Sequence, residues 1–240
     1  MLNIAGVLLI LVVTPDIGAN RSKENECVVL LHGLARGPSS MNLIGKALTA
    51  AGYSVANIGY PSRSKCIESL AEEAIRRGIS TCMTSSPKKI HFVTHSLGGI
   101  LVRYYFENHS LANLGHVVML GPPNQGSHVV DRWRNVPGYR AINGPAGMQL
   151  GTDSNSLPKS LGPVEFSLGI IAGTRSVNPI LSLSLPNPND GKVHVENTKA
   201  PGMKDHLVLP YTHTFMMRSS KVISQILYYL ANGRFDRSIA

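Results

Sequence analysis

The sequence has few charged residues and no long apolar run. Asp, Glu, Lys and Arg make up 15% of its 240 residues, which favours a compact, loop-rich protein over a coiled coil or a helical bundle. It contains no stretch of 18 or more apolar residues, which excludes a protein with several membrane spans. Hydrophobic residues still amount to 43%, which suffices for a buried core and excludes a disordered chain.

Negative charge is scarcer than positive charge. The 23 Lys and Arg exceed the 14 Asp and Glu by nine, a balance that suits an anionic partner such as a nucleic acid or a lipid surface. The basic residues are scattered, without a run of five or six of them, so we expect no nucleic-acid partner. We interpret the charge as a solvated surface that is compatible with contact at a membrane or lipid interface.

Cysteine is also rare, with Cys27, Cys66 and Cys82. Three cysteines cannot all pair, and no C-x-x-C spacing indicates a zinc site. A bridge between Cys66 and Cys82 would have to span a helical segment of about 18 Å, which is close to the limit of what the following residues can retrace. The geometry disfavours this bridge, and we expect free, buried thiols.

The N-terminus begins with a short apolar run over residues 1–13. Its length suits the apolar region of a signal peptide and is too short for a spanning helix. No Lys or Arg precedes Arg21, and Ile17 stands where a small residue is preferred before a cut after Ala19. We expect residues 1–19 to be a signal peptide of an exported protein, periplasmic or secreted; the alternative is a buried N-terminal strand or helix in a cytoplasmic protein. Residues 20–240 are expected to form one domain.

Short apolar runs alternate with helical patterns from residue 27 onward. Such alternation predicts a mostly parallel sheet with helices on both faces. The expected strands are residues 28–31, 53–58, 89–94, 116–120, 166–172 and 207–209, and helical patterns follow at residues 43–51, 67–75, 100–105 and 222–230.

Residues 127–163 break this alternation. The segment contains the single tryptophan, Trp133, with four prolines and several glycines. It is either a small cap over an active site or a surface connection.

Ser96 follows an apolar strand and is followed by Leu-Gly-Gly and a helix. This arrangement predicts a nucleophile elbow, a tight turn that exposes the serine oxygen at a helix N-terminus. The N–H of Leu97 would then help to stabilise an oxyanion. The residue two positions after the serine is glycine (Gly98), whereas the residue two positions before it is Thr94.

A second motif, His32-Gly33-Leu34, ends the first expected strand. An oxyanion hole needs a second N–H from a neighbouring strand end, and Gly33 allows the backbone of Leu34 to supply it. We interpret His32 as a structural residue that bonds its own loop.

A serine nucleophile needs a base and an acid that orients the base. In elbow enzymes the chain order is serine, acid, histidine, and the candidates after Ser96 are Asp131, Asp153, Glu165, Asp190, Glu196, Asp205, His194, His206 and His213. Sites in open parallel sheets lie at the carboxyl ends of the strands. Asp205 and His206 precede the last strand, whereas His213 follows it and Asp190 lies in a polar turn, so we select Asp190 and His213. The alternatives are a turn residue for Asp190 and a helix-capping residue for His213. We expect His95, next to Ser96, to have a packing role.

Together, the segments 31–34, 94–99, 121–127, 189–191 and 212–215 resemble the lipase and esterase branch of the α/β-hydrolase superfamily. The resemblance extends from about residue 28 to residue 230. It implies an α/β-hydrolase fold, a triad of Ser96, Asp190 and His213, an oxyanion hole at Leu34 and Leu97, carboxylic ester substrates, and no metal or organic cofactor. Two departures are Thr94 in place of the usual glycine and about 16 residues between the preceding strand and Asp190.

The sequence therefore predicts a serine esterase or lipase that acts on a small-molecule or lipid ester, without an obligate protein partner. Acyl transfer to another alcohol uses the same chemistry and is an alternative. A binding module without catalysis is the alternative of a different class, because fold alone does not determine function.

Overall fold

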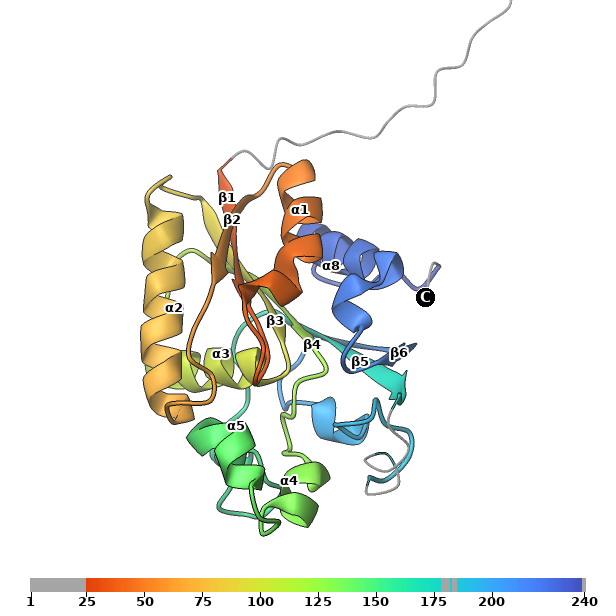
Figure 1. Cartoon of the computed structure of the whole chain (residues 1–240). Helices are drawn as coiled ribbons and strands as arrows, with labels where there is room; N and C mark the ends of the chain where they lie inside the picture. Colours follow the sequence, from red (N-terminus) through yellow and green to blue (C-terminus); the bar gives the residue numbers. More distant parts are fainter. Residues whose placement is uncertain (1–24, 178–181, 183–184, 239–240) are drawn as a thin grey trace, which may run out of the picture.

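A computed structural model describes residues 25–177, 182 and 185–238 (Figure 1). The expected signal peptide, residues 1–19, lies outside this range. No helix within the described ranges is long and apolar enough to cross a membrane.

Six strands form one sheet in the order β2-β1-β3-β4-β5-β6, and every neighbouring pair is parallel. This confirms the predicted parallel sheet, and it places the carboxyl ends of all six strands at one edge. The strands are β1 (Glu26–Leu31), β2 (Ser54–Ile58), β3 (Lys89–His95), β4 (Leu114–Leu120), β5 (Leu168–Arg175) and β6 (Asp205–Thr212).

Helices cover both faces of the sheet (Figure 1). The side chains of β1 alternate between the two layers: Val29 and Leu31 pack in the core beneath α2 and α3, whereas Val28 and Leu30 pack in the core beneath α1 and α8. The covering helices are α1 (Asn42–Ala50), α2 (Ile67–Met83), α3 (Leu97–Asn108) and α8 (Ser220–Asn232). Two separate cores, one on each face, therefore fix the sheet and hold its edge in place.

The segment between β4 and β5 forms a cap at the carboxyl edge of the sheet. Its helices are α4 (His128–Trp133), α5 (Tyr139–Met148) and α6 (Leu157–Ser160). In Figure 1, α4 and α5 lie beyond the ends of the strands. Of the two alternatives for residues 127–163, the structure has the cap.

The expectation of free, buried thiols is wrong for two of the three cysteines, and the third, Cys66, is free but only partly buried. Cys27 in β1 and Cys82 in the last turn of α2 form a disulfide, with 5.7 Å between their Cα atoms, and Cys66 is free. Cys66 and Cys82 do not pair, as the geometry predicted. The bond joins residues 55 positions apart, and α2 brings its end back over the start of β1, a contact that spacing along the chain did not show.

Candidate active site

Ser96 occupies the turn between β3 and α3. Its backbone has φ 52° and ψ −117°, a conformation that a residue with a side chain rarely adopts and that is concentrated at functional sites. A side chain at Gly98 would place its Cβ 2.8 Å from the carbonyl oxygen of Leu31, so the turn can approach β1 this closely because position 98 is glycine. The Ser96 N–H donates to the carbonyl of Leu120 at 2.9 Å. The turn thus has the geometry predicted for a nucleophile elbow.

Thr94 fits where the resemblance leads one to expect glycine. It lies in β3 in register with Leu31 on one side and Met119 on the other. The side chain is fully buried, and its hydroxyl has no hydrogen-bond partner in the described part of the chain. The strand therefore has room for a β-branched side chain, and the hydroxyl contributes no hydrogen bond.

Asp190 and His213 form a buried pair at the carboxyl edge. Oδ2 of Asp190 lies 2.7 Å from Nδ1 of His213, and the His213 N–H donates to the Asp190 carbonyl at 3.0 Å. The other carboxylate oxygen, Oδ1, accepts the N–H groups of Lys192 and Val193 at 2.9 and 2.8 Å. The carboxylate is thus held by the turn that follows it, and it fixes the orientation of the imidazole.

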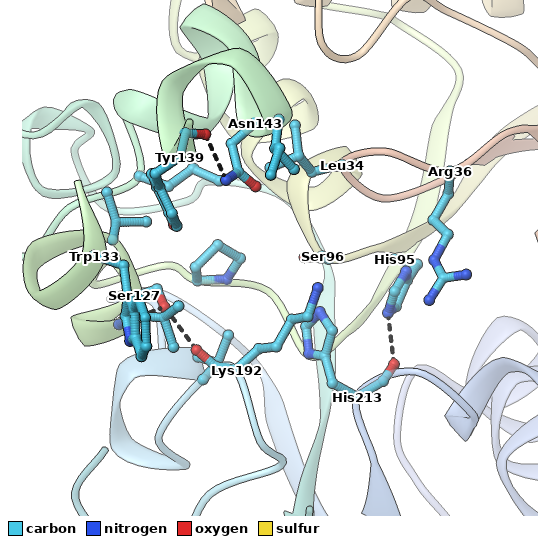
Figure 2. A pocket seen from close by; sticks show the side chains of 16 residues that line it. Leu34, Arg36, His95, Ser96, Ser127, Trp133, Tyr139, Asn143, Lys192 and His213 are labelled. Atoms are coloured by element: carbon cyan, nitrogen blue, oxygen red, sulfur yellow. Dashed lines mark hydrogen bonds between the residues drawn. The ribbon is translucent and has the colours of Figure 1, made fainter. Parts of the chain in front are cut away.

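Ser96 and His213 line the same cavity, which has a volume of about 290 Å³. Figure 2 shows them near one another, with Trp133 and Tyr139 of the cap at the other end. No hydrogen bond joins the Ser96 hydroxyl to the imidazole among the described residues, and such bonds are often loose before substrate binds. Apolar residues that line the cavity are Leu34, Pro123, Val129, Val130, Trp133, Ile142, Leu150 and Val193.

The N–H groups of Leu34 and Leu97 are the predicted oxyanion donors. Leu97 is the first residue of α3, so its N–H has no acceptor within the helix. In the described ranges, neither N–H donates to a loop carbonyl or to a side chain. Next to Leu34, the N–H of Ala35 donates to Oγ of Ser62 at 3.0 Å, which anchors this loop. Both donors are thus available to a ligand.

His95 does more than pack. Its Nε2 lies 2.9 Å from the carbonyl oxygen of His213. Burial holds the pKa of His95 well below its ordinary value, and the nearby His213 lowers it further. The ring therefore stays neutral and donates Nε2–H to that carbonyl, which positions the loop that carries His213.

His32 has the structural role that we predicted. Its Nδ1 lies 2.9 Å from the carbonyl of Gly33, and the ring stacks on Tyr60 with 4.0 Å between centroids. Its Nε2 accepts the N–H of Tyr60, and the Tyr60 hydroxyl donates to the His32 carbonyl. Burial lowers the pKa of His32, so it remains a neutral brace of the loop.

The other acids and imidazoles that we considered do not line the cavity. They are Asp131, Asp153, Glu165, Glu196, Asp205, His194 and His206. Asp205 begins β6 at the amino edge, as predicted, and accepts the N–H of Phe235. Among the described residues, no group of three or more His, Cys, Asp or Glu is arranged to hold a metal ion.

Sequence reasoning missed Arg103, a buried residue of α3. Its guanidinium donates to the carbonyls of Asn124, Pro158, Leu161 and Gly162 at 2.9 to 3.3 Å. It therefore ties both ends of the cap to the helix that follows Ser96. Its only signal in the sequence is an arginine within an otherwise apolar helical face.

The parallel sheet, the strained serine turn at its carboxyl edge and the order Ser96, Asp190, His213 define an α/β-hydrolase fold. Solved structures share it. The mature lipase BlEst2 of Bacillus licheniformis superposes with a TM-score of 0.69 at 17% identity, over 90% of this chain and 96% of that chain.

Two further structures have the same fold at lower TM-scores. The metagenomic carboxyl esterase MGS0156 has a TM-score of 0.61 at 18% identity, over 82% of this chain and 66% of that one. The phospholipase PlaB of Legionella pneumophila has a TM-score of 0.55 at 16% identity, over 72% of this chain and 45% of that one. No protein-family model and no curated protein matches the sequence.

Proposed function

We propose that the protein is a serine hydrolase that cleaves carboxylic esters. The observation that carries the proposal is the buried bond between Asp190 and His213, whose imidazole shares a cavity with the strained Ser96. An acid, an imidazole and a hydroxyl in this order are what acyl transfer to serine needs. The lipase and the carboxyl esterase among the similar structures support ester substrates.

In the proposed reaction, Oγ of Ser96 forms a bond to the ester carbonyl carbon while its proton passes to Nε2 of His213. The carbon–oxygen bond to the alcohol then breaks, and the alcohol takes that proton and leaves an acyl-enzyme. Water attacks the acyl carbon in the second half, again with His213 as base, and releases the acid and the free serine. Asp190 stabilises the imidazolium through Nδ1.

The negative oxygen of each tetrahedral intermediate would accept the N–H groups of Leu34 and Leu97. These donors are already in place, so their dipoles need no reorganisation during the reaction. The helix dipole of α3 adds to this stabilisation, because Leu97 is at its N-terminus. This mechanism needs neither a metal nor an organic cofactor.

We further propose that the cap meets a lipid interface. Val136 and Ile142 are 43% and 60% exposed, and Ile142 also lines the cavity. A jump in rate when the substrate forms aggregates would support this proposal, and equal rates on dissolved and aggregated esters would contradict it.

An oxidising compartment is the location that we propose. The disulfide between Cys27 and Cys82 supports it, since such bonds persist outside the reducing cytosol. Detection of the protein in a periplasmic or culture-medium fraction tests this, and its recovery from the cytosol with both thiols reduced would contradict it.

The proposed activity is tested with 4-nitrophenyl esters of short and long acids, on the wild type and Ser96→Ala. The wild type should turn over, and kcat/KM of the variant should fall by about four orders of magnitude or more. Ser80→Ala, an exposed serine of α2, is the matched control and should keep full activity.

Two other results would replace the proposal. A product in which the acyl group is carried to an added alcohol in preference to water would assign an acyltransferase. Absence of turnover on every ester, together with no labelling of Ser96 by a fluorophosphonate, would indicate a binding module.

A further inference from the structure

Two cationic side chains line the cavity beside the reactive serine. Arg36 lies in the loop after β1, and Lys192 lies in the turn after Asp190. They are the only Lys or Arg side chains among the sixteen residues that line this cavity, and no Asp or Glu is among the sixteen. The side chains that line the cavity therefore have a net positive charge.

Neither cation has a partner among the residues that the structure describes. The guanidinium of Arg36 and Nζ of Lys192 form no hydrogen bond and no ion pair in the described ranges. Asp190, whose carboxylate acts on the charge of Lys192, is buried and already accepts three hydrogen bonds, one from the His213 ring and two from backbone N–H groups. In the described ranges it forms no ion pair with either cationic side chain.

The two charges lie close enough to influence each other. Although the Lys192 side chain reaches solvent, the surrounding protein lowers its pKa, and the charge of Arg36 lowers it further, while Asp190 acts in the opposite direction. Both cations also lower the pKa of His95. The two like charges repel each other, Asp190 offsets part of this repulsion without binding either side chain, and a bound anion would relieve the rest.

The positions of the side chains divide the cavity into two ends. Figure 2 shows Lys192 extending toward Ser96, and Arg36 beside His95, away from the cap residue Trp133. The end under the cap is mostly apolar, with Ser127, Tyr139 and Asn143 as its polar residues, and the two cationic groups lie toward the other end. An ester bound at Ser96 would have one part in each.

We propose that Arg36 and Lys192 form a subsite for an anionic group of the substrate, a carboxylate or a phosphate, carried by the part of the ester that lies away from the cap. This proposal rests on the proposed ester hydrolysis and specifies its substrate class. Arginine presents a fork of donors and lysine a mobile point charge, and both bind carboxylate and phosphate oxygens.

The test compares two pairs of esters that differ in charge. The carboxylate pair is 4-nitrophenyl hemiglutarate and 4-nitrophenyl pentanoate; the phosphate pair is 1-butyrylglycerol 3-phosphate and 1-butyrylglycerol. The measured quantity is the ratio of kcat/KM for the anionic ester to kcat/KM for the neutral ester. The wild type should favour the anionic member of at least one pair, and the pair with the larger ratio identifies the anion.

Each variant that removes a charge should lower this ratio about tenfold, the size of one charged hydrogen bond, through KM. These variants are Arg36→Gln and Lys192→Met, and Arg36→Lys and Lys192→Arg should retain most of the preference. The matched controls Arg234→Gln and Lys46→Met remove exposed charges elsewhere and should leave the ratio at its wild-type value. Because the side chain of Lys192 is open to solvent, added salt should lower the preference for the anionic ester.

Two results would overturn the subsite. One is a ratio that Arg36→Gln and Lys192→Met leave unchanged. The other is an equal fall in kcat for the anionic and the neutral ester, which would show that the cations stabilise the transition state of any ester.

A binding measurement separates this proposal from the proposed catalysis. Calorimetry on Ser96→Ala with monomethyl glutarate and with methyl pentanoate needs no turnover. Ser96→Ala should bind monomethyl glutarate more tightly than methyl pentanoate, and this difference should disappear when Arg36→Gln and Lys192→Met are introduced into Ser96→Ala. This result supports the subsite even if the wild type cleaves no ester. Equal binding of the two ligands contradicts the subsite even if the wild type is an active esterase.

Discussion

Nδ1 of His213 donates a hydrogen bond to Oδ2 of Asp190 across 2.7 Å, in a part of the structure where both side chains are buried. The two residues are 23 positions apart, and the carboxylate is one hydrogen bond away from the ring that lines the same cavity as Ser96. This bond sets which imidazole nitrogen has the proton in the resting state. It leaves Nε2 unprotonated and free to accept the proton of Ser96.

Asp190→Asn tests this bond. Asn keeps an oxygen for the N–H groups of Lys192 and Val193, but its amide presents N–H toward Nδ1 and stabilises the other tautomer. We expect kcat to fall by about 10⁴ with little change in the unfolding midpoint, since the fold keeps its contacts. Asp153→Asn, outside the cavity, is the control. A kcat within tenfold of the wild type would show that another residue orients the imidazole.

Ser62 holds the loop that presents the N–H of Leu34. Its Oγ accepts the N–H of Ala35 at 3.0 Å, and Ala35 has a φ of 54°, a strained conformation that needs such support. Ser62→Ala should lower kcat about tenfold, less than the 10² to 10³ cost of losing an oxyanion donor outright. KM should stay constant, and Ser80→Ala should resemble the wild type. A change confined to KM would show that Ser62 acts on substrate binding instead.

The local part of the site could be predicted from the sequence. The elbow at Ser96 depends on a strand, a turn and a helix that follow one another directly, and its glycine requirement is visible in Gly98. His213 could be placed because it follows the last strand, at the edge where parallel strands end. Asp190 required a choice among several acids, and the polar turn around it favoured the one that the structure pairs with His213.

Contacts between distant segments could not be predicted. The partner of Cys82 is Cys27, which depends on how α2 crosses β1. Arg36 and Lys192 are 156 positions apart and line the same cavity because the two loops that carry them lie at the same edge of the sheet. In the sequence, Ser62 looks like an ordinary turn residue. Its role depends on the contact between its loop, which follows β2, and the loop after β1 that contains Ala35.

The disulfide between Cys27 and Cys82 should contribute about 4 kcal/mol to the free energy of unfolding, because it closes a loop of 55 residues in the unfolded chain. The double variant Cys27→Ala/Cys82→Ala should lose this amount in urea unfolding, and the reduced wild type should match the double variant. Cys66→Ser, which removes the free thiol, is the control. An oxidised wild type as unstable as the double variant would contradict the expected contribution.

His91 should make stability depend on acid pH. The ring is buried in β3, where Nδ1 accepts the N–H of His116 at 2.8 Å, and Nε2 therefore has the proton and donates to Glu26 at 3.2 Å. Burial lowers the pKa of His91 to about 4; Glu26 opposes this effect, whereas His116 and Lys89 add to it. The folded imidazole thus resists protonation at a pH where an exposed one accepts it.

Between pH 6.5 and about 4 the unfolded chain binds a proton at His91 that the folded chain does not, so acid favours the unfolded state. The free energy of unfolding should be fully retained above pH 6.5 and should fall below it, by up to about 1.4 kcal/mol per pH unit from this group. His91→Gln should flatten this slope, whatever its effect at neutral pH, and the two proteins should have parallel profiles above pH 7. Urea unfolding of the wild type and of His91→Gln, at intervals from pH 4 to 8, measures the two profiles. Identical slopes of the unfolding free energy below pH 6.5 would show that His91 is not the group that titrates.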